Sequence, residues 1–233
     1  QVRTVTATLV IRSEPNQMYG TIRQLAAATP IDASTEQPLV VQFDEETPLL
    51  IFARCTRRTV AVGTSNRKGF TRGAIEFEAS DPRKYALVES AFVTGLPQPE
   101  DGLEYPLVFP LDWGTPGSTG NVEADNVGDA PTHPTFAITG PCTTPSITNI
   151  NTGAVLEYDI ALASTDTLYV DTNQGTVTLN GTQANRLYTA TTRSNPEASF
   201  VLPPGKSALA FRSDDSPPDP AATLTVTWRS AYW

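Results

Sequence analysis

The chain has 233 residues and a net charge of −9, which allows one large domain or two small ones, each with its own core. Twenty prolines, 15 glycines, one methionine and few helical periodicities indicate a mainly β protein with many turns. No apolar run reaches the roughly 18 residues of a membrane span, and this excludes a transmembrane helix. The first residues already alternate as a strand without a signal-peptide layout, so we expect upstream residues to be missing or removed.

The charge is unevenly distributed. Residues 1–100 hold 11 basic and 11 acidic side chains, and the other 133 residues hold 5 basic and 14 acidic ones. An acidic second half disfavours binding to nucleic acid. The first half carries a basic cluster, which we interpret as solvated strand ends or a subunit interface because no aromatic side chains accompany it as in a nucleic-acid site: Arg54, Arg57, Arg58, Arg67, Lys68 and Arg72.

The N-terminal half reads as one helix and several strands. Residues 2–11 alternate between apolar and polar side chains, which predicts a strand, and the apolar residues between 16 and 29 recur at helical spacing until Pro30. Further strands are predicted at 39–43, 49–55, 59–62, 74–79 and 85–93. The simplest packing of these elements is one helix against a small, mostly antiparallel sheet or barrel.

The stretch at 95–102, GLPQPEDG, marks a domain boundary, because it combines two prolines, two glycines and acidic residues. We therefore expect a first domain at 1–95, a linker at 96–104 and a second domain at 105–233. Short, regularly spaced strands in the second domain predict a β-sandwich. They are expected at 105–111, 135–139, 146–150, 155–162, 168–170, 176–179, 187–190, 209–211 and 224–228, with a long polar loop between the first two.

The stretch DTNQG, at 171–175, allows two interpretations. Asp171, Asn173 and Gly175 stand at alternating positions, as the first ligands of a calcium loop do. An EF-hand loop, however, places glycine sixth and glutamate twelfth, where this chain has Thr176 and Thr182. Alternating apolar residues on both sides favour the tip of a β-hairpin, so we predict no metal site here.

No set of residues predicts catalysis. Glu76 and Glu78 lie two apart on a predicted strand, a spacing that fits the carboxylate pair of a glycoside hydrolase and equally fits a solvated strand face. His133 is the only histidine, and its place between prolines favours a turn or strand edge over a nucleophile's base. Cys55 and Cys142 have no metal-ligand spacing and are interpreted as small unpaired core thiols. We predict no catalytic, cofactor-binding or metal-binding residues.

The aromatic residues of the second half raise one question of ligand binding. Trp228 continues an apolar series and is expected in the core, whereas Trp113 stands just before a polar loop. A tryptophan there either packs at a strand end or stacks on a glycan. Trp113 is therefore the single candidate glycan-stacking residue.

Several stretches, in order, resemble one family. The following stretches are similar to the distal tail proteins of siphovirus-type bacteriophages, including members from actinobacteriophages: RTVTATLVI (3–11), IEFEASDPRKYA (75–86), YPLVFPLDWG (105–114), NVGDAPTHPTFAITGP (126–141), DTLYVDTNQGTVTLNG (166–181) and LPPGKSALAF (202–211). The stretches span nearly the whole chain. In this resemblance Asp81 and Pro82 form a turn, and Gly128 and Pro131 shape the entry into the sandwich.

The resemblance implies a structural virion protein of the phage tail tip, without enzymatic activity. It implies a first domain that forms a hexameric ring and joins the tail tube. The second domain is implied to be a galectin-like or carbohydrate-binding-module-like sandwich that supports the tail-tip hub or tail-associated protein and receptor-binding proteins. Family members carry further N-terminal strands before RTVT, which leaves the ring interface undefined. The alternative is a carbohydrate-binding or receptor-binding module that recognises host glycans. Neither function implies a cofactor, nucleic-acid binding or membrane insertion.

Overall fold

The computed structural model describes residues 2–14, 16–31, 33–42, 44–100, 117–181 and 184–233. It divides into two compact units, one formed by Gln1–Leu87 with Trp233 and the other by Val88–Tyr232. No helix in the described ranges is long and apolar enough to cross a membrane.

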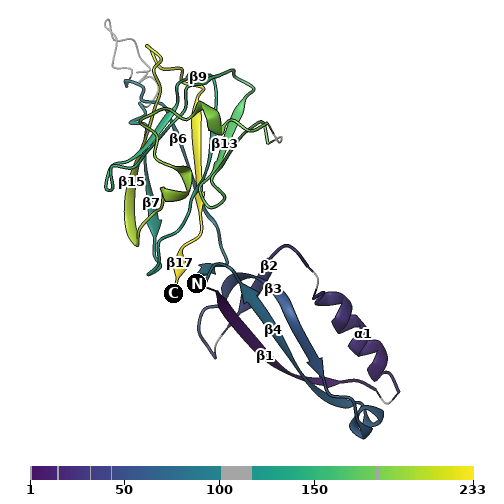
Figure 1. Cartoon of the computed structure of the whole chain (residues 1–233). Coiled ribbons are helices and arrows are strands. Elements are labelled where there is room, and N and C mark those ends of the chain that lie inside the picture. The colour runs from purple at the N-terminus through teal and green to yellow at the C-terminus, as the bar shows by residue number, and fades with distance from the viewer. Residues whose placement is uncertain (1, 15, 32, 43, 101–116, 182–183) are drawn as a thin grey trace, which may run out of the picture. The chain divides into compact units, whose positions relative to one another are not determined.

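The first unit is an antiparallel sheet with one α-helix (Figure 1). The strands follow the order β1-β4-β3-β5, and β2 also pairs with β3. The longest pairing joins β1 and β4 over ten residue pairs, from Arg3 opposite Ala79 to Arg12 opposite Phe70. The elements are β1 (Arg3–Arg12), α1 (Met18–Ala28), β2 (Gln37–Val41), β3 (Leu49–Val60), the 3-10 helix η1 (Thr64–Lys68), β4 (Phe70–Ala79) and β5 (Lys84–Ala86).

The core of the first unit is small. Ile51, Ala53 and Ala79 are buried together, with half-buried apolar residues of β1, β2 and β4 around them. Arg58 connects β3 to the end of α1: its Nη1 donates hydrogen bonds to the carbonyl oxygens of Ala26 and Thr29 and to the Thr29 hydroxyl. A cation at a helix C-terminus satisfies carbonyls that have no partner within the helix.

The second unit is a β-sandwich (Figure 1). One sheet has the order β14-β13-β8-β16-β6, the other β11-β10-β15-β7, and β12 pairs with β9 beside them. The strands are β6 (Ser90–Gly95), β7 (Asn121–Asn126), β8 (Thr135–Thr139), β9 (Cys142–Thr143), β10 (Ser146–Asn149), β11 (Val155–Glu157), β12 (Ala161–Leu162), β13 (Thr167–Asp171), β14 (Thr176–Leu179), β15 (Gly205–Arg212), β16 (Thr223–Trp228) and β17 (Ala231–Tyr232). Two 3-10 helices, η2 (Leu187–Thr189) and η3 (Glu197–Ser199), lie between β14 and β15.

The core of the second unit comes from inward residues of both sheets. Phe136 of β8 packs edge-on against Phe200, with ring centroids 5.4 Å apart. Alternation places every second residue of these strands inside, which is the period of two that a half-buried strand requires. The cluster includes Val122, Ile138, Ile147, Leu156, Leu168, Val170, Leu209, Phe211, Leu224, Val226 and Trp228.

The mainly β fold, with one α-helix in the described part of the chain, confirms the fold class. The helix predicted at 16–29 is α1, and the hairpin predicted at 171–175 is the β13–β14 pair, with Asp171 opposite Thr176. The Asp171 carboxylate accepts hydrogen bonds from the backbone N–H groups of Asn173 and Gln174, and Gly175 has a φ of +64°. DTNQG is therefore a turn.

Five predictions about strands were wrong. The strands predicted at 49–55 and 59–62 are one strand, β3. The strand predicted at 85–93 is two, β5 and β6, and the one predicted at 155–162 is also two, β11 and β12. Residues 187–190 hold a 3-10 helix, and the polar loop contains strand β7. The two compact units meet at Leu87–Val88, because β6 pairs with β16 of the sandwich. The linker at 96–104 stays a prediction. The strand predicted at 105–111 lies outside the described residues.

Candidate functional surfaces

A bulge arranges the charged face of the first unit. Arg54 pairs with Glu78 and Arg57 with Glu76, because Thr56 is an extra residue on β3 that shifts the register. Without the bulge, Arg54 and Arg57 would point to opposite faces. Ion pairs of 3.2 Å and 3.6 Å follow, all four side chains being partly exposed.

Exposure to solvent and pairing with arginines across the strands are enough to explain why Glu76 and Glu78 lie on this face. Both Glu76 and Glu78 face an arginine, and exposed pairs of this kind contribute about 0–1 kcal/mol each. Two arginines of the basic cluster, Arg54 and Arg57, thus form ion pairs on the surface of the sheet. Arg58 lies apart from it, at the end of α1.

The turn SDPRKY is held by one carboxylate. Asp81 accepts hydrogen bonds from the Arg83 backbone N–H at 3.0 Å, from Arg83 Nε and Nη2 at 2.8 and 2.7 Å, and from the Tyr85 hydroxyl at 2.5 Å. Partial burial alone would raise the pKa of Asp81, but the hydrogen bonds from Arg83 and Tyr85 hold it below its usual value. These residues form a structural corner.

The entry into the sandwich is built on Asn126. Its Nδ2 donates to the carbonyl oxygens of Ala130 and Leu202, and its Oδ1 accepts from the N–H groups of Gly128 and Ala231. A buried amide with four partners fixes this loop. Gly128 fits because a Cβ there would stand 1.8 Å from the Ala231 carbonyl oxygen. The role that the resemblance implied for Gly128 thus has a steric cause.

Buried acids of the second unit also have structural partners. The Tyr158 hydroxyl donates to Glu197 at 3.2 Å, and the Thr191 hydroxyl donates to Glu157 at 2.8 Å. Burial, with the neighbouring Glu197 carboxylate, raises the pKa of the Tyr158 hydroxyl. An activated phenol would need the opposite shift. These groups therefore anchor the segment at 191–197 to the core.

The outer face of the β14-β13-β8-β16-β6 sheet is rich in hydroxyl groups and also carries the carboxylate of Asp171. Two cross-strand hydroxyl pairs order it, Thr135 with Thr227 at 3.1 Å and Thr139 with Thr167 at 3.2 Å. Alternation and register place eight threonines on it: Thr135, Thr139, Thr167, Thr176, Thr178, Thr223, Thr225 and Thr227. Such a surface suits contact with another polar surface or with a hydroxyl-rich ligand.

A concavity of about 360 Å³ lies on this threonine face. The ring of Tyr169, 44 % exposed, forms one wall, and its cross-strand neighbour Ala137 is too small to fill the space beside it. Asp171 and the threonines of β8, β14 and β16 complete the lining. Among the described residues that line it there is no cation.

The remaining predicted candidates are dispersed. Trp113 lies outside the described residues. His133 stands just before β8, and Cys55 and Cys142 are buried thiols in different units. Burial, with the nearby Asp215, raises the pKa of Cys142 to about 12. Across the described ranges, no group of histidine, cysteine and acidic side chains has the arrangement of a metal site. Sequence reasoning missed Tyr169, whose exposure depends on the small residue opposite.

Comparisons with known proteins fit this architecture. Residues 127–232 match the family described as "Siphovirus-type tail component, C-terminal domain". Among solved structures, the chain is similar to the Dit protein of phage SPP1, described as a paradigm of the hub adsorption apparatus in phages that infect Gram-positive bacteria. The identity is 14 %, the match covers 100 % of this chain and 80 % of that one, and the TM-score is 0.64. A search of curated proteins finds no match.

The sandwich and the family match agree: residues 127–232 are similar to the C-terminal domain of siphovirus-type tail components. The likeness to SPP1 Dit extends over the whole chain and shows that the fold is Dit-like. Both findings support the resemblance to siphovirus distal tail proteins.

Proposed function

We propose that the chain is the distal tail protein that forms a hexameric ring and joins the tail tube to the tail-tip hub and host-recognition proteins. It acts by assembly, without turnover. The Dit-like fold over the full chain supports this function, because SPP1 Dit is described as part of a hub adsorption apparatus.

The first unit carries the assembly argument. Ile51, Ala53 and Ala79 form a small buried cluster. Nine large hydrophobic residues among the described residues of this unit are exposed: Val2, Val10, Tyr19, Ile31, Val40, Phe52, Val62, Leu87 and Trp233. A unit of this size buries too little apolar surface to be stable by a wide margin. Association with further copies covers such residues and stabilises the fold by mass action.

The strand β1 offers a second assembly feature. Among the described residues it pairs with β4 alone, and its ten residues contain no proline and carry charges only at the ends, Arg3 and Arg12. Long edges of this kind accept a further strand. A strand from upstream residues or from a neighbouring copy would fit here.

Mass photometry of the 233-residue chain tests the ring. Six chains of 25.0 kDa give about 150 kDa, and we expect this species to gain population as concentration rises. A protein that stays at the mass of one chain at every concentration, and also on isolated tail tubes, would overturn the ring.

The concavity beside Tyr169 favours a second candidate function, the recognition of a neutral saccharide. A partly exposed aromatic ring beside hydroxyl groups and one carboxylate provides stacking and hydrogen bonding together. In a glycan-array experiment we expect a signal that Tyr169→Ala removes. Tyr188→Ala, which truncates a more exposed tyrosine outside this concavity, is the matched control. Absence of signal from the unaltered protein would end this candidate.

A further inference from the structure

A pocket of about 610 Å³ lies between the start of α1 and the 3-10 helix η1 in the first unit. Two segments that are far apart in the sequence form it: Met18 and Tyr19 come from one, Val62, Asn66 and Arg67 from the other. Tyr19 and Val62 are among the most exposed large hydrophobic residues of the chain and form an apolar rim. The pocket therefore combines an apolar rim with polar groups.

The start of α1 contributes positive potential. Its N-cap residue, Gln17, makes no side-chain cap, and the first turn contains no acidic residue. The N–H groups of Gly20 and Thr21 bond to the Gln17 carbonyl, whereas Met18 and Tyr19 precede them and line the pocket. A helix start without a cap or an acid favours an anion from elsewhere.

Asn66 is the independent sign of a missing partner. The residue is only 5 % exposed, and its Oδ1 accepts a hydrogen bond from the Gly63 N–H at 3.3 Å. That contact fixes the orientation of the amide, so Nδ2 is the group that faces away from it. Nδ2 is buried and has no partner among the described residues. A buried hydrogen-bond donor without an acceptor costs about 1–3 kcal/mol, so an oxygen atom of a ligand is favoured beside Nδ2.

Arg67 adds a full charge. It is exposed, and no carboxylate in the described part of the chain pairs with it. Together with Arg12, Lys68 and Arg72 it makes this end of the unit basic, because Glu14 offsets only one of these positive charges. A buried amide donor, a helix start and a guanidinium together suit a carboxylate, which accepts bonds on two oxygens.

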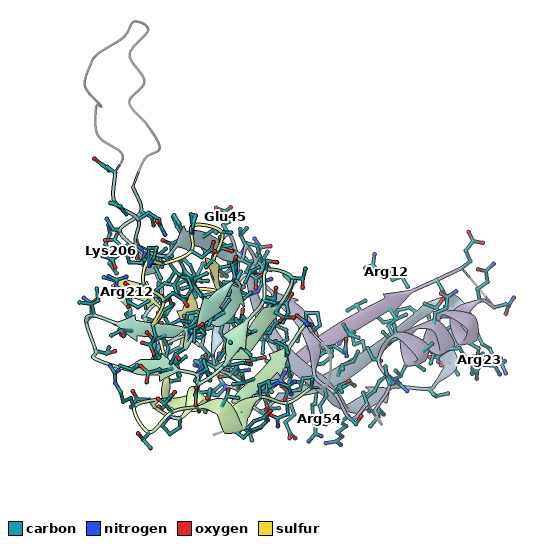
Figure 2. The ribbon with its side chains drawn as sticks, turned by 90° about the horizontal axis from the view of Figure 1, so that it is seen from above. Arg12, Arg23, Glu45, Arg54, Lys206 and Arg212 are labelled. Atoms are coloured by element: carbon teal, nitrogen blue, oxygen red, sulfur yellow. The ribbon has the colours of Figure 1, made fainter. Side chains whose placement is uncertain are left out.

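The same unit presents carboxylates at its opposite end. Asp44, Glu45 and Glu46 are exposed in the turn that leads into β3, and none of them pairs with a cation within the described residues. The β3 strand runs from that turn toward η1 for 12 residues, so the two ends lie roughly 35 Å apart. Figure 2 shows Glu45 and Arg12 well separated in this unit.

We propose that the pocket binds the carboxylate of Glu45 or Glu46 from a second copy of this chain. The contact is head to tail, and it repeats around the ring because each copy carries both halves of the interface. Opposite charge at the two ends, together with an apolar rim that a free small anion would leave exposed, favours a second copy as the occupant. This contact rests on the ring proposed above and names one interface within it.

Two variants test the contact. Asn66→Asp keeps the acceptor for the Gly63 N–H and replaces the amide nitrogen with a carboxylate oxygen, while Glu45→Lys with Glu46→Lys reverses the charge of the turn. In mass photometry we expect each to raise the apparent dissociation constant of assembly roughly tenfold or more. Arg67→Glu should behave alike, and Arg23→Glu, the same charge change on an exposed position of α1 outside the pocket, should leave assembly unchanged.

Mixing the variants sharpens the test. An equimolar mixture of Asn66→Asp and the doubly substituted turn leaves one intact pocket and one intact turn per pair, so we expect dimers and no ring. Rings that persist in both variants would overturn this contact and leave the ring standing. If only added acetate raises the melting temperature, and Asn66→Asp abolishes that rise while rings persist, the pocket holds a small anion instead. Unaltered protein that never assembles would overturn ring and contact together.

Discussion

Gly128→Ala tests whether close backbone approach fixes the entry into the sandwich. The added Cβ would stand 1.8 Å from the carbonyl oxygen, 2.6 Å from the carbonyl carbon and 2.9 Å from the nitrogen of Ala231. All three are backbone atoms, so no side-chain rotation relieves the overlap. Either the loop at 126–130 or the chain at Ala231 must move.

The cost follows from what that movement breaks. The Ala231 carbonyl accepts from the Ala130 N–H at 3.0 Å, and the Ala231 N–H donates to Asn126 Oδ1 at 3.2 Å. Overpacking costs about 1–3 kcal/mol, and each lost hydrogen bond costs about 1 kcal/mol. We expect Gly128→Ala to lower the free energy of unfolding of the sandwich by about 3–5 kcal/mol, a large share of the 5–15 kcal/mol typical of a domain.

Urea denaturation, followed by tryptophan fluorescence to which the buried Trp228 contributes, measures this change. Gly95→Ala is the control, because its Cβ would meet nothing nearer than 3.6 Å, and we expect a change below about 1 kcal/mol. If Gly128→Ala unfolds within about 0.5 kcal/mol of the unaltered protein, the steric reasoning is wrong.

Three further predictions follow from single contacts. Arg58→Met should lower the stability of the first unit by about 1–3 kcal/mol, because carbonyls at the end of α1 lose their donor; an unchanged melting temperature would contradict this. Asp81 has a lowered pKa in the fold, so its contribution exists above about pH 4 and is lost as pH falls through the folded value; Asp81→Asn should flatten the stability profile at acid pH, and parallel profiles would argue against it. Cys142, buried and with a pKa raised to about 12, should react with thiol reagents at pH 8 only after unfolding, which immediate labelling of the native protein would disprove.

Alternation of apolar and polar residues along the chain predicted the strands that bury one face and are joined by residues typical of turns. Leu168 and Val170 before the turn, with Val177 and Leu179 after it, predicted the β13–β14 hairpin, because an Asx turn and a glycine separate two runs of period two. Helix α1 was predicted in the same way, because its apolar residues recur with a period near 3.6 until Pro30.

Tertiary contacts decided the elements that the sequence did not predict. The bulge at Thr56 breaks alternation in the middle of β3, so one strand looked like two. Strand β7 was missed because its third inward residue is Asn126, which is polar but fully satisfied by four hydrogen bonds. Leu187 and Tyr188 suggested a strand, yet both are exposed in a 3-10 turn.

The candidate surfaces, too, were predicted where they depend on local sequence patterns and missed where they depend on tertiary contacts. Glu76 and Glu78 were expected on one face, and they are, but their arginine partners depend on the bulge. The pocket beside Asn66 joins segments about 45 residues apart, which no local pattern reveals. Its only sequence sign was the absence of an acidic residue or a capping side chain at the start of α1.

Electron microscopy of virions that carry a labelled copy of this chain tests the central claim most directly. We expect the label at the tip of the tail, in a single ring at the end of the tail tube. Label along the tube or on the capsid, with none at the tip, would contradict a distal tail protein.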